Sequence, residues 1–130
     1  EPFTKPFYDY CENIRLGVFG DAKLAHRDLI FTFFYIPPDD DNFVNQIIHI
    51  AGEDYVKFVK IEASRETLLD RVENVDRAKY SKINSKSGLT RYLKENNWSK
   101  SIEKTDSLII NTDNLTPDEA VQKIIEEYDL

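Results

Sequence analysis

The sequence predicts an α/β domain built around a mostly parallel sheet, and three observations support this. Segments with helical periodicity alternate along the chain with short apolar runs. The run 29–36 is rich in β-branched and aromatic residues and lacks polar alternation, which is typical of a strand buried on both faces of a parallel sheet. The 130 residues contain no repeat, low-complexity tract or linker, so we expect one domain, 1–130.

Helices are expected on either side of this apolar run. Residues 7–25 repeat apolar side chains at three- and four-residue steps, which is the spacing of a helix. After two prolines, the acidic residues 39–41 begin a second helix, because carboxylates favour the positive end of the helix dipole. We expect Gly52 to close that helix.

The rest of the chain continues the alternation. Residues 56–61 and 108–110 predict two further strands, and residues 85–97 predict a helix. Ser64 is suited to cap the helix after the first of these strands. The last helix begins with a capping-box pattern, Thr116-Pro117-Asp118-Glu119. Its expected buried face consists of Val121, Ile124, Ile125 and Tyr128.

Composition excludes several classes of protein. The net charge of −7 argues against a general nucleic-acid binder, which would present a basic face. Cys11 is the only cysteine, so no internal disulfide forms, and His26 and His49 lack metal-ligand spacing. With no signal-peptide pattern and no apolar run near about 18 residues, we expect a soluble cytoplasmic protein.

One pattern is missing from these residues. No stretch reads G-x-x-x-x-G-K-[ST], the loop whose backbone N–H groups and lysine hold nucleotide phosphates. The glycines are scattered, and none opens a helix after a strand. The predicted strand 29–36 is apolar enough to need a neighbour on both sides, which a strand–loop–helix unit of about 30 residues would supply.

Three segments carry a resemblance to P-loop kinases. They read L-I-F-T-F-F-Y-I-P-P-D-D-D at 29–41, V-K-I-E-A-S-R-E-T-L-L-D-R-V at 59–72 and L-I-I-N-T-D-N-L-T-P-D-E at 108–119. The chain resembles the C-terminal two-thirds of small-molecule P-loop kinases and AAA-family ATPase-like proteins, including shikimate-kinase-like proteins, gluconate kinase and chloramphenicol phosphotransferase. The resemblance implies a three-layer P-loop kinase-like fold whose first strand and phosphate-binding loop have no counterpart here.

The resemblance also implies that residues 71–85 form a basic lid over ATP. Arg71 and Arg77 would contact the phosphates as catalytic residues, since guanidinium groups fork onto phosphate oxygens. Lys79 and Lys82 would bind the nucleotide together with Arg77. The alternative is that Arg71 pairs with a neighbouring acidic side chain and that the lysines are ordinary surface charge.

Two other segments are candidate sites. By the same resemblance, Asn111, Thr112 and Asp113 would flank the adenine, mainly through the backbone; the alternative is a polar turn before the last helix. Asp39 follows the most buried predicted strand, at the edge where parallel sheets bind ligands. Its carboxylate would hold Mg²⁺ through water or accept a proton from a substrate hydroxyl, unless it only begins a helix.

These features predict part of an ATP- and Mg²⁺-dependent phosphotransferase that acts on a small hydroxylated molecule. Activity is not expected without a phosphate-binding loop. The alternatives are a non-catalytic kinase-like binding or interaction module and a nucleoside-triphosphate hydrolase. The expected partners are the phosphate acceptor and either a second copy of the chain or an N-terminal segment that completes the sheet. Neither nucleic acid nor a membrane is expected as a partner.

Overall fold

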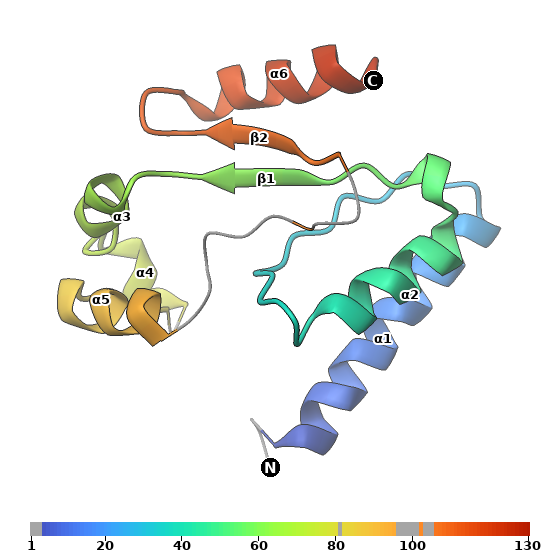
Figure 1. Ribbon diagram of the computed structural model, residues 1–130, viewed down its shortest axis with the longest axis horizontal. Helices are drawn as coiled ribbons and strands as arrows, with labels where there is room; N and C mark the ends of the chain where they lie inside the picture. Colours follow the sequence, from blue (N-terminus) through green and yellow to red (C-terminus); the bar gives the residue numbers. More distant parts are fainter. Residues whose placement is uncertain (1–3, 81, 96–101, 103–105) are drawn as a thin grey trace. The chain divides into compact units, whose positions relative to one another are not determined.

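The computed structural model describes residues 4–80, 82–95, 102 and 106–130. The chain divides into two compact units, Glu1–Lys57 and Phe58–Leu130, which are described separately below. The first unit is helical, and the second combines helices with a two-stranded parallel sheet (Figure 1). The described residues therefore form a mixed α/β structure. The assignment of 1–130 to a single domain stays a prediction.

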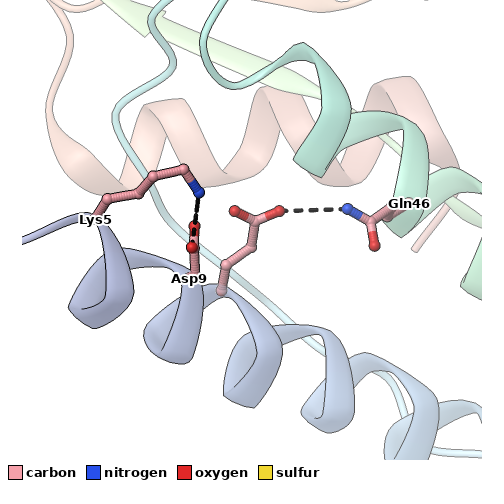
Figure 2. A network of polar contacts seen from close by, with 4 residues as sticks. Lys5, Asp9 and Gln46 are labelled. Atoms are coloured by element: carbon pink, nitrogen blue, oxygen red, sulfur yellow. Dashed lines mark hydrogen bonds and ion pairs between the residues drawn. The ribbon is translucent and has the colours of Figure 1, made fainter.

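Two helices form the framework of the first unit. They are α1 (Lys5–Leu24) and α2 (Asp41–Ala51), which lie side by side and are followed by a short 3₁₀ turn, η1 (Glu53–Tyr55) (Figure 1). The Gln46 amide donates a hydrogen bond of 3.3 Å to Glu12 across the pair, and Lys5 lies 2.7 Å from Asp9 within α1 (Figure 2). Both helices predicted for this part of the chain are thereby confirmed.

The expected central strand is not present in the first unit. Residues 29–36 form no strand, so the prediction of a buried strand on this segment is wrong. Phe31 and Phe33 are half-buried, and each packs edge-on against Phe43 of α2, with ring centroids 6.1 and 5.8 Å away. By contrast, the Ile30 side chain is 95% exposed. Packing on a helix thus takes the place of the sheet for part of this apolar run, whereas Leu29, Ile30 and Phe34 are exposed.

The ends of α2 agree with the sequence. The Ile36 N–H donates a bond of 2.6 Å to the Asp40 carboxylate just before the helix, and Phe43, Val44 and Ile47 form its buried face. Gly52 ends the helix with φ of 97°, in the region of backbone conformation that favours glycine. This confirms Gly52 as the residue that closes the helix.

The sheet lies in the second unit. Its strands are β1 (Val59–Glu62) and β2 (Leu108–Asn111), which pair in parallel with Val59 opposite Leu108. Parallel pairing was expected, although β1 begins three residues later than the predicted strand 56–61. Ile110 of β2 is 2% exposed and lies at the centre of the core of this unit, together with Val72.

Helices complete the second unit. They are α3 (Arg65–Arg71), α4 (Asp76–Lys79), α5 (Lys86–Glu95) and α6 (Pro117–Tyr128). The caps of α3 and α6 are those that the sequence predicts, Ser64 and the box formed by Thr116 and Glu119. Residues 96 and 97 of the helix predicted at 85–97 lie outside the described residues.

The buried face predicted for α6 is partly wrong. Val121 and Ile125 are 50% and 36% exposed, and Ala120 is the buried residue of this helix. The prediction for Tyr128 is partly confirmed. This residue is half-buried, and its hydroxyl donates a bond of 2.9 Å to the carbonyl of Phe58. The helix pattern alone did not reveal which side of the apolar stripe meets the sheet.

Candidate functional site

The candidate site is the edge of the sheet where β1 and β2 end. Because the strands are parallel, both carboxyl ends lie at this edge, followed by α3 after β1 and by the turn into α6 after β2 (Figure 1). Ligands of open parallel sheets bind at this kind of edge. We call the segments 62–64 and 111–113 the edge loops.

Asp113 joins the two edge loops. Its carboxylate accepts a bond of 2.7 Å from the backbone N–H of Ser64, the residue that caps α3. The Ser64 hydroxyl in turn accepts the N–H of Thr67 at 3.2 Å. The bond from the Ser64 N–H lowers the pKa of Asp113 below the ordinary value of an aspartate, so the carboxylate is ionised at neutral pH.

Thr112 makes a second connection between the edge loops. Its backbone N–H donates a bond of 2.8 Å to the carbonyl of Glu62, which extends the pairing of the strands by one residue. Its hydroxyl also donates to this carbonyl, at 3.0 Å. The Thr112 side chain is therefore held in one orientation by the end of β1.

Arg71, the last residue of α3, binds to Thr112. Its Nη1 donates to the hydroxyl of Thr112 at 3.0 Å, and its Nη2 donates to the carbonyl of Thr112 at 2.7 Å. The alternative was an ion pair between Arg71 and a neighbouring acidic side chain. No such ion pair forms among the described residues. Instead, Asp70 and Glu73 lie 3.7 and 4.0 Å from Lys86.

Both acceptors of Arg71 are neutral oxygens. Among the described residues, no carboxylate forms an ion pair with this guanidinium, and its remaining N–H groups have no hydrogen-bond partner. The side chain is also exposed. The arrangement therefore presents an oriented positive charge to solvent at the edge of the sheet, which is a group that a phosphate would bind.

The other basic residues of the predicted lid, 71–85, make local contacts. Arg77 donates from Nε to the carbonyl of Ile83 at 2.8 Å. Lys79 lies 2.8 Å from Asp76, one turn earlier in α4. The Lys82 ammonium lies 5.8 Å from the ring centre of Tyr80. The structure thus holds these residues within the segment and brings only Arg71 of the predicted lid onto the edge loops.

The remaining predicted site residues divide between the two units. Asn111 belongs to the edge loops, and its side-chain oxygen accepts the N–H of Asp113 at 2.8 Å. Asp39 is exposed in the turn 37–40 of the first unit, and because residues 29–36 form no strand, it does not lie at the sheet edge where it was expected. Within the described part of the chain, no cluster of three or more histidine, cysteine or acidic side chains is arranged to hold a metal ion.

Sequence reasoning missed the role of the β1 end at this edge. Ser64 was identified only as a helix cap, and the carbonyl of Glu62 was not considered. The available signal was the position of Ser64 directly after a predicted strand, since such residues lie at the ligand-binding edge of a parallel sheet.

The comparisons with known proteins name no relative. No model of a protein family, no curated protein and no solved structure matches the chain. A search of the described residues for membrane spans found no helix that is both long and apolar enough to cross a bilayer.

Proposed function

We propose that the chain is part of an ATP-dependent phosphotransferase that transfers phosphate to a small hydroxylated molecule in the cytoplasm. The observation that carries this proposal is the Arg71 guanidinium. It is exposed, fixed by two hydrogen bonds, and free of carboxylate partners among the described residues, at the carboxyl edge of a parallel sheet. Nucleotide phosphates are anions, and a guanidinium group can bind two of their oxygens at once through parallel N–H bonds. The acceptor class rests on the resemblance to small-molecule kinases.

Arg71, Arg77 and the edge loop 111–113 each have a role in this proposal. Arg71 contacts the transferred phosphate and stabilises its charge as the bond to the nucleotide breaks. Arg77 joins it by exchanging its bond with Ile83 for a phosphate oxygen. The edge loop 111–113 flanks the base.

Mg²⁺ fits this proposal as a companion of ATP. This ion keeps several waters and binds nucleotide phosphates with one or two carboxylates, so it does not require a preformed cluster of protein ligands. When bound, it neutralises charge on the phosphates. The residues here would contribute the Arg71 guanidinium as a further positive charge on the same anion. A phosphate-binding loop supplied by further residues would complete the site, since these 130 residues contain no G-x-x-x-x-G-K-[ST].

One observation favours a second candidate, a non-catalytic nucleotide-binding module. Arg77, Lys79 and Lys82 are each engaged in contacts within their own segment, so a lid that closes on phosphate would have to break them. A module that only binds ATP needs Arg71 and the edge loops, but it does not need the lid to move.

The test measures ATP binding and turnover with matched arginine variants. We expect the chain to bind Mg·ATP more tightly than adenosine in isothermal titration calorimetry. Arg71→Ala should weaken this binding about tenfold, the effect of losing a charged hydrogen bond. Arg71→Lys should restore only part of it, because an ammonium keeps the charge and loses the fork. Arg91→Ala, on the exposed face of α5, removes the same charge away from the edge loops and should leave binding unchanged.

Three results would separate the candidates. Equal affinity for ATP and adenosine, or equal loss in the Arg71 and Arg91 variants, would contradict phosphate binding at Arg71. ATP binding that Arg77→Ala does not alter would favour the non-catalytic module. If a protein that carries a phosphate-binding loop together with this chain transfers phosphate, and Arg77→Ala lowers its turnover at unchanged stability, the phosphotransferase is supported.

A further inference from the structure

We propose that Thr112 is the positioning residue of this site and sets the orientation of Arg71 for phosphate. This inference rests on the proposed function. It assigns to Thr112 a role different from contact with the base. Both acceptors of the Arg71 guanidinium, the hydroxyl at 3.0 Å and the carbonyl at 2.7 Å, come from this one residue.

Two bonds to one residue fix the plane of the guanidinium. A group held at Nη1 alone would turn about that bond, whereas bonds from Nη1 and Nη2 to two oxygens also define the direction of its remaining N–H groups. Since the acceptors are uncharged, the positive charge is oriented without being neutralised. An anion at the edge of the sheet therefore meets donors that are already aligned.

The hydroxyl of Thr112 is fixed in its turn. It donates its proton to the carbonyl of Glu62 at 3.0 Å, so its oxygen presents lone pairs to Arg71. The backbone N–H of Thr112 donates to the same carbonyl at 2.8 Å. A continuous series of bonds thus runs from the end of β1 through Thr112 to Arg71.

This series connects residues far apart in the sequence. Arg71 and Thr112 are separated by 41 positions, and Thr112 and Glu62 by 50. The direction of the guanidinium therefore depends on the pairing of β1 with β2, and it is preorganised before any ligand binds. Preorganisation of this kind increases affinity by reducing the ordering that binding requires.

The experiment uses Thr112→Val and Thr112→Ser with the whole chain and Mg·ATP as the probe. Valine has nearly the shape of threonine but removes the hydroxyl acceptor of Nη1 and leaves only the backbone carbonyl for Nη2, whereas serine keeps the hydroxyl. We expect Thr112→Val to weaken ATP binding about fivefold to tenfold and Thr112→Ser to restore it to within about twofold. The matched control is Thr90→Val, which changes a half-buried threonine of α5. This variant should bind ATP as the unmodified chain does.

A second measurement needs no ligand. In ¹⁵N NMR spectra, hindered rotation of a held guanidinium separates its Nη signals, and free rotation averages them. We expect separate Arg71 signals in the unmodified chain and in Thr112→Ser, and averaged signals in Thr112→Val. Backbone spectra of the variants report whether each remains folded.

The outcomes distinguish this inference from the proposed function. If the unmodified chain does not bind ATP, the proposed function fails, while the ligand-free Nη signals still decide whether Thr112 orients Arg71. If ATP binds and Thr112→Val changes neither the affinity nor the Nη signals, Thr112 has no positioning role. If serine fails to rescue a folded variant, the hydroxyl is not the group that matters, and the inference is overturned.

Discussion

Asp113 illustrates how a single side chain organises the ends of two strands. Its carboxylate accepts the Ser64 N–H at 2.7 Å, at the first turn of α3, and its own N–H is held by Asn111 at 2.8 Å. The acceptor must be ionised to be most effective, since a carboxylate binds a backbone N–H more strongly than a neutral acid does. One of the two connections between the edge loops therefore depends on the charge of Asp113.

The lowered pKa of Asp113 leads to a prediction about pH. A carboxyl group whose pKa is lower in the folded state stabilises the fold above its unfolded pKa, and this contribution is lost as the pH falls through the folded value. We expect Asp113→Asn to lower stability at pH 7 and to flatten the loss of stability below about pH 4. Urea unfolding followed at several pH values measures both effects.

Asp54→Asn is the control for this prediction. Asp54 is exposed in η1, away from the edge loops in the sequence. A change at Asp113 no larger than at Asp54, or the same slope of stability with pH in both variants, would show that Asp113 does not join the edge loops.

The ends of the helices in this chain are determined by local capping residues, whereas their central residues are held by packing. The N-terminus of α6 is an example, because the Thr116 hydroxyl accepts the N–H of Glu119 at 3.3 Å while the Glu119 carboxylate accepts the Thr116 N–H at 2.7 Å. These contacts span three residues, so the sequence alone is enough to predict them.

We expect Thr116→Ala to lower the free energy of unfolding by about 1 kcal/mol, the usual effect of losing an N-cap. Thr116→Ser keeps the hydroxyl and should have only a small effect. Denaturant unfolding of the two variants measures the difference in their free energies of unfolding, provided that these free energies fall equally steeply with denaturant concentration. Equal stability of the alanine and serine variants would mean that the box does not hold the start of α6.

Replacing Gly52 at the end of α2 by alanine should lower stability, whereas replacing a glycine inside a helix should raise it. With φ of 97°, a Cβ at this position would lie 3.2 Å from the Tyr55 ring, so Gly52→Ala should cost about 1–2 kcal/mol. Gly17 lies inside α1, and a Cβ there meets nothing within 4 Å. Gly17→Ala should therefore stabilise by roughly 0.5–1 kcal/mol.

Thermal unfolding of the two alanine variants tests this pair. The midpoint should fall for Gly52→Ala and rise for Gly17→Ala. A rise in both would contradict the left-handed conformation at Gly52.

Sequence reasoning succeeded where a signal is local and failed where it depends on a distant partner. The caps Ser64 and Thr116 and the closing Gly52 were predicted because each acts within its own turn. The run 29–36 has the composition of a strand, but a strand also requires a neighbour, and its aromatic rings pack on helices instead. The same limit applies to Arg71, whose partner Thr112 is 41 residues away.

At the scale of the whole molecule, exposed apolar surface is the property that bears on association with other chains. In the first unit, Ile30 is 95% exposed within an uncharged apolar run, and β-prone uncharged segments of this kind pair readily with other chains. A second copy of the chain, or a segment that completes a sheet, would find a surface to pair with here.

We expect Ile30→Lys to reduce association of the chain, because a charge interrupts such a segment. Light scattering across a range of protein concentrations measures this. Leu24→Lys is the matched control, since Leu24 is 81% exposed in the same unit but lies outside the run. Equal effects of the two lysines would assign association to general hydrophobicity rather than to the segment 29–36.

The central claim is that a nucleotide binds at the edge loops with its phosphates on Arg71. The most direct measurement is the set of backbone and Arg side-chain ¹⁵N NMR shifts of the whole chain during titration with Mg·ATP. We predict saturable shifts at residues 62–64 and 111–113 and at the Nε of Arg71. The edge-loop shifts should need about tenfold more Mg·ATP to saturate in Arg71→Ala and should be unchanged in Arg91→Ala. Shifts confined to other residues, or shifts at the edge loops that persist unchanged without Arg71, would contradict the claim.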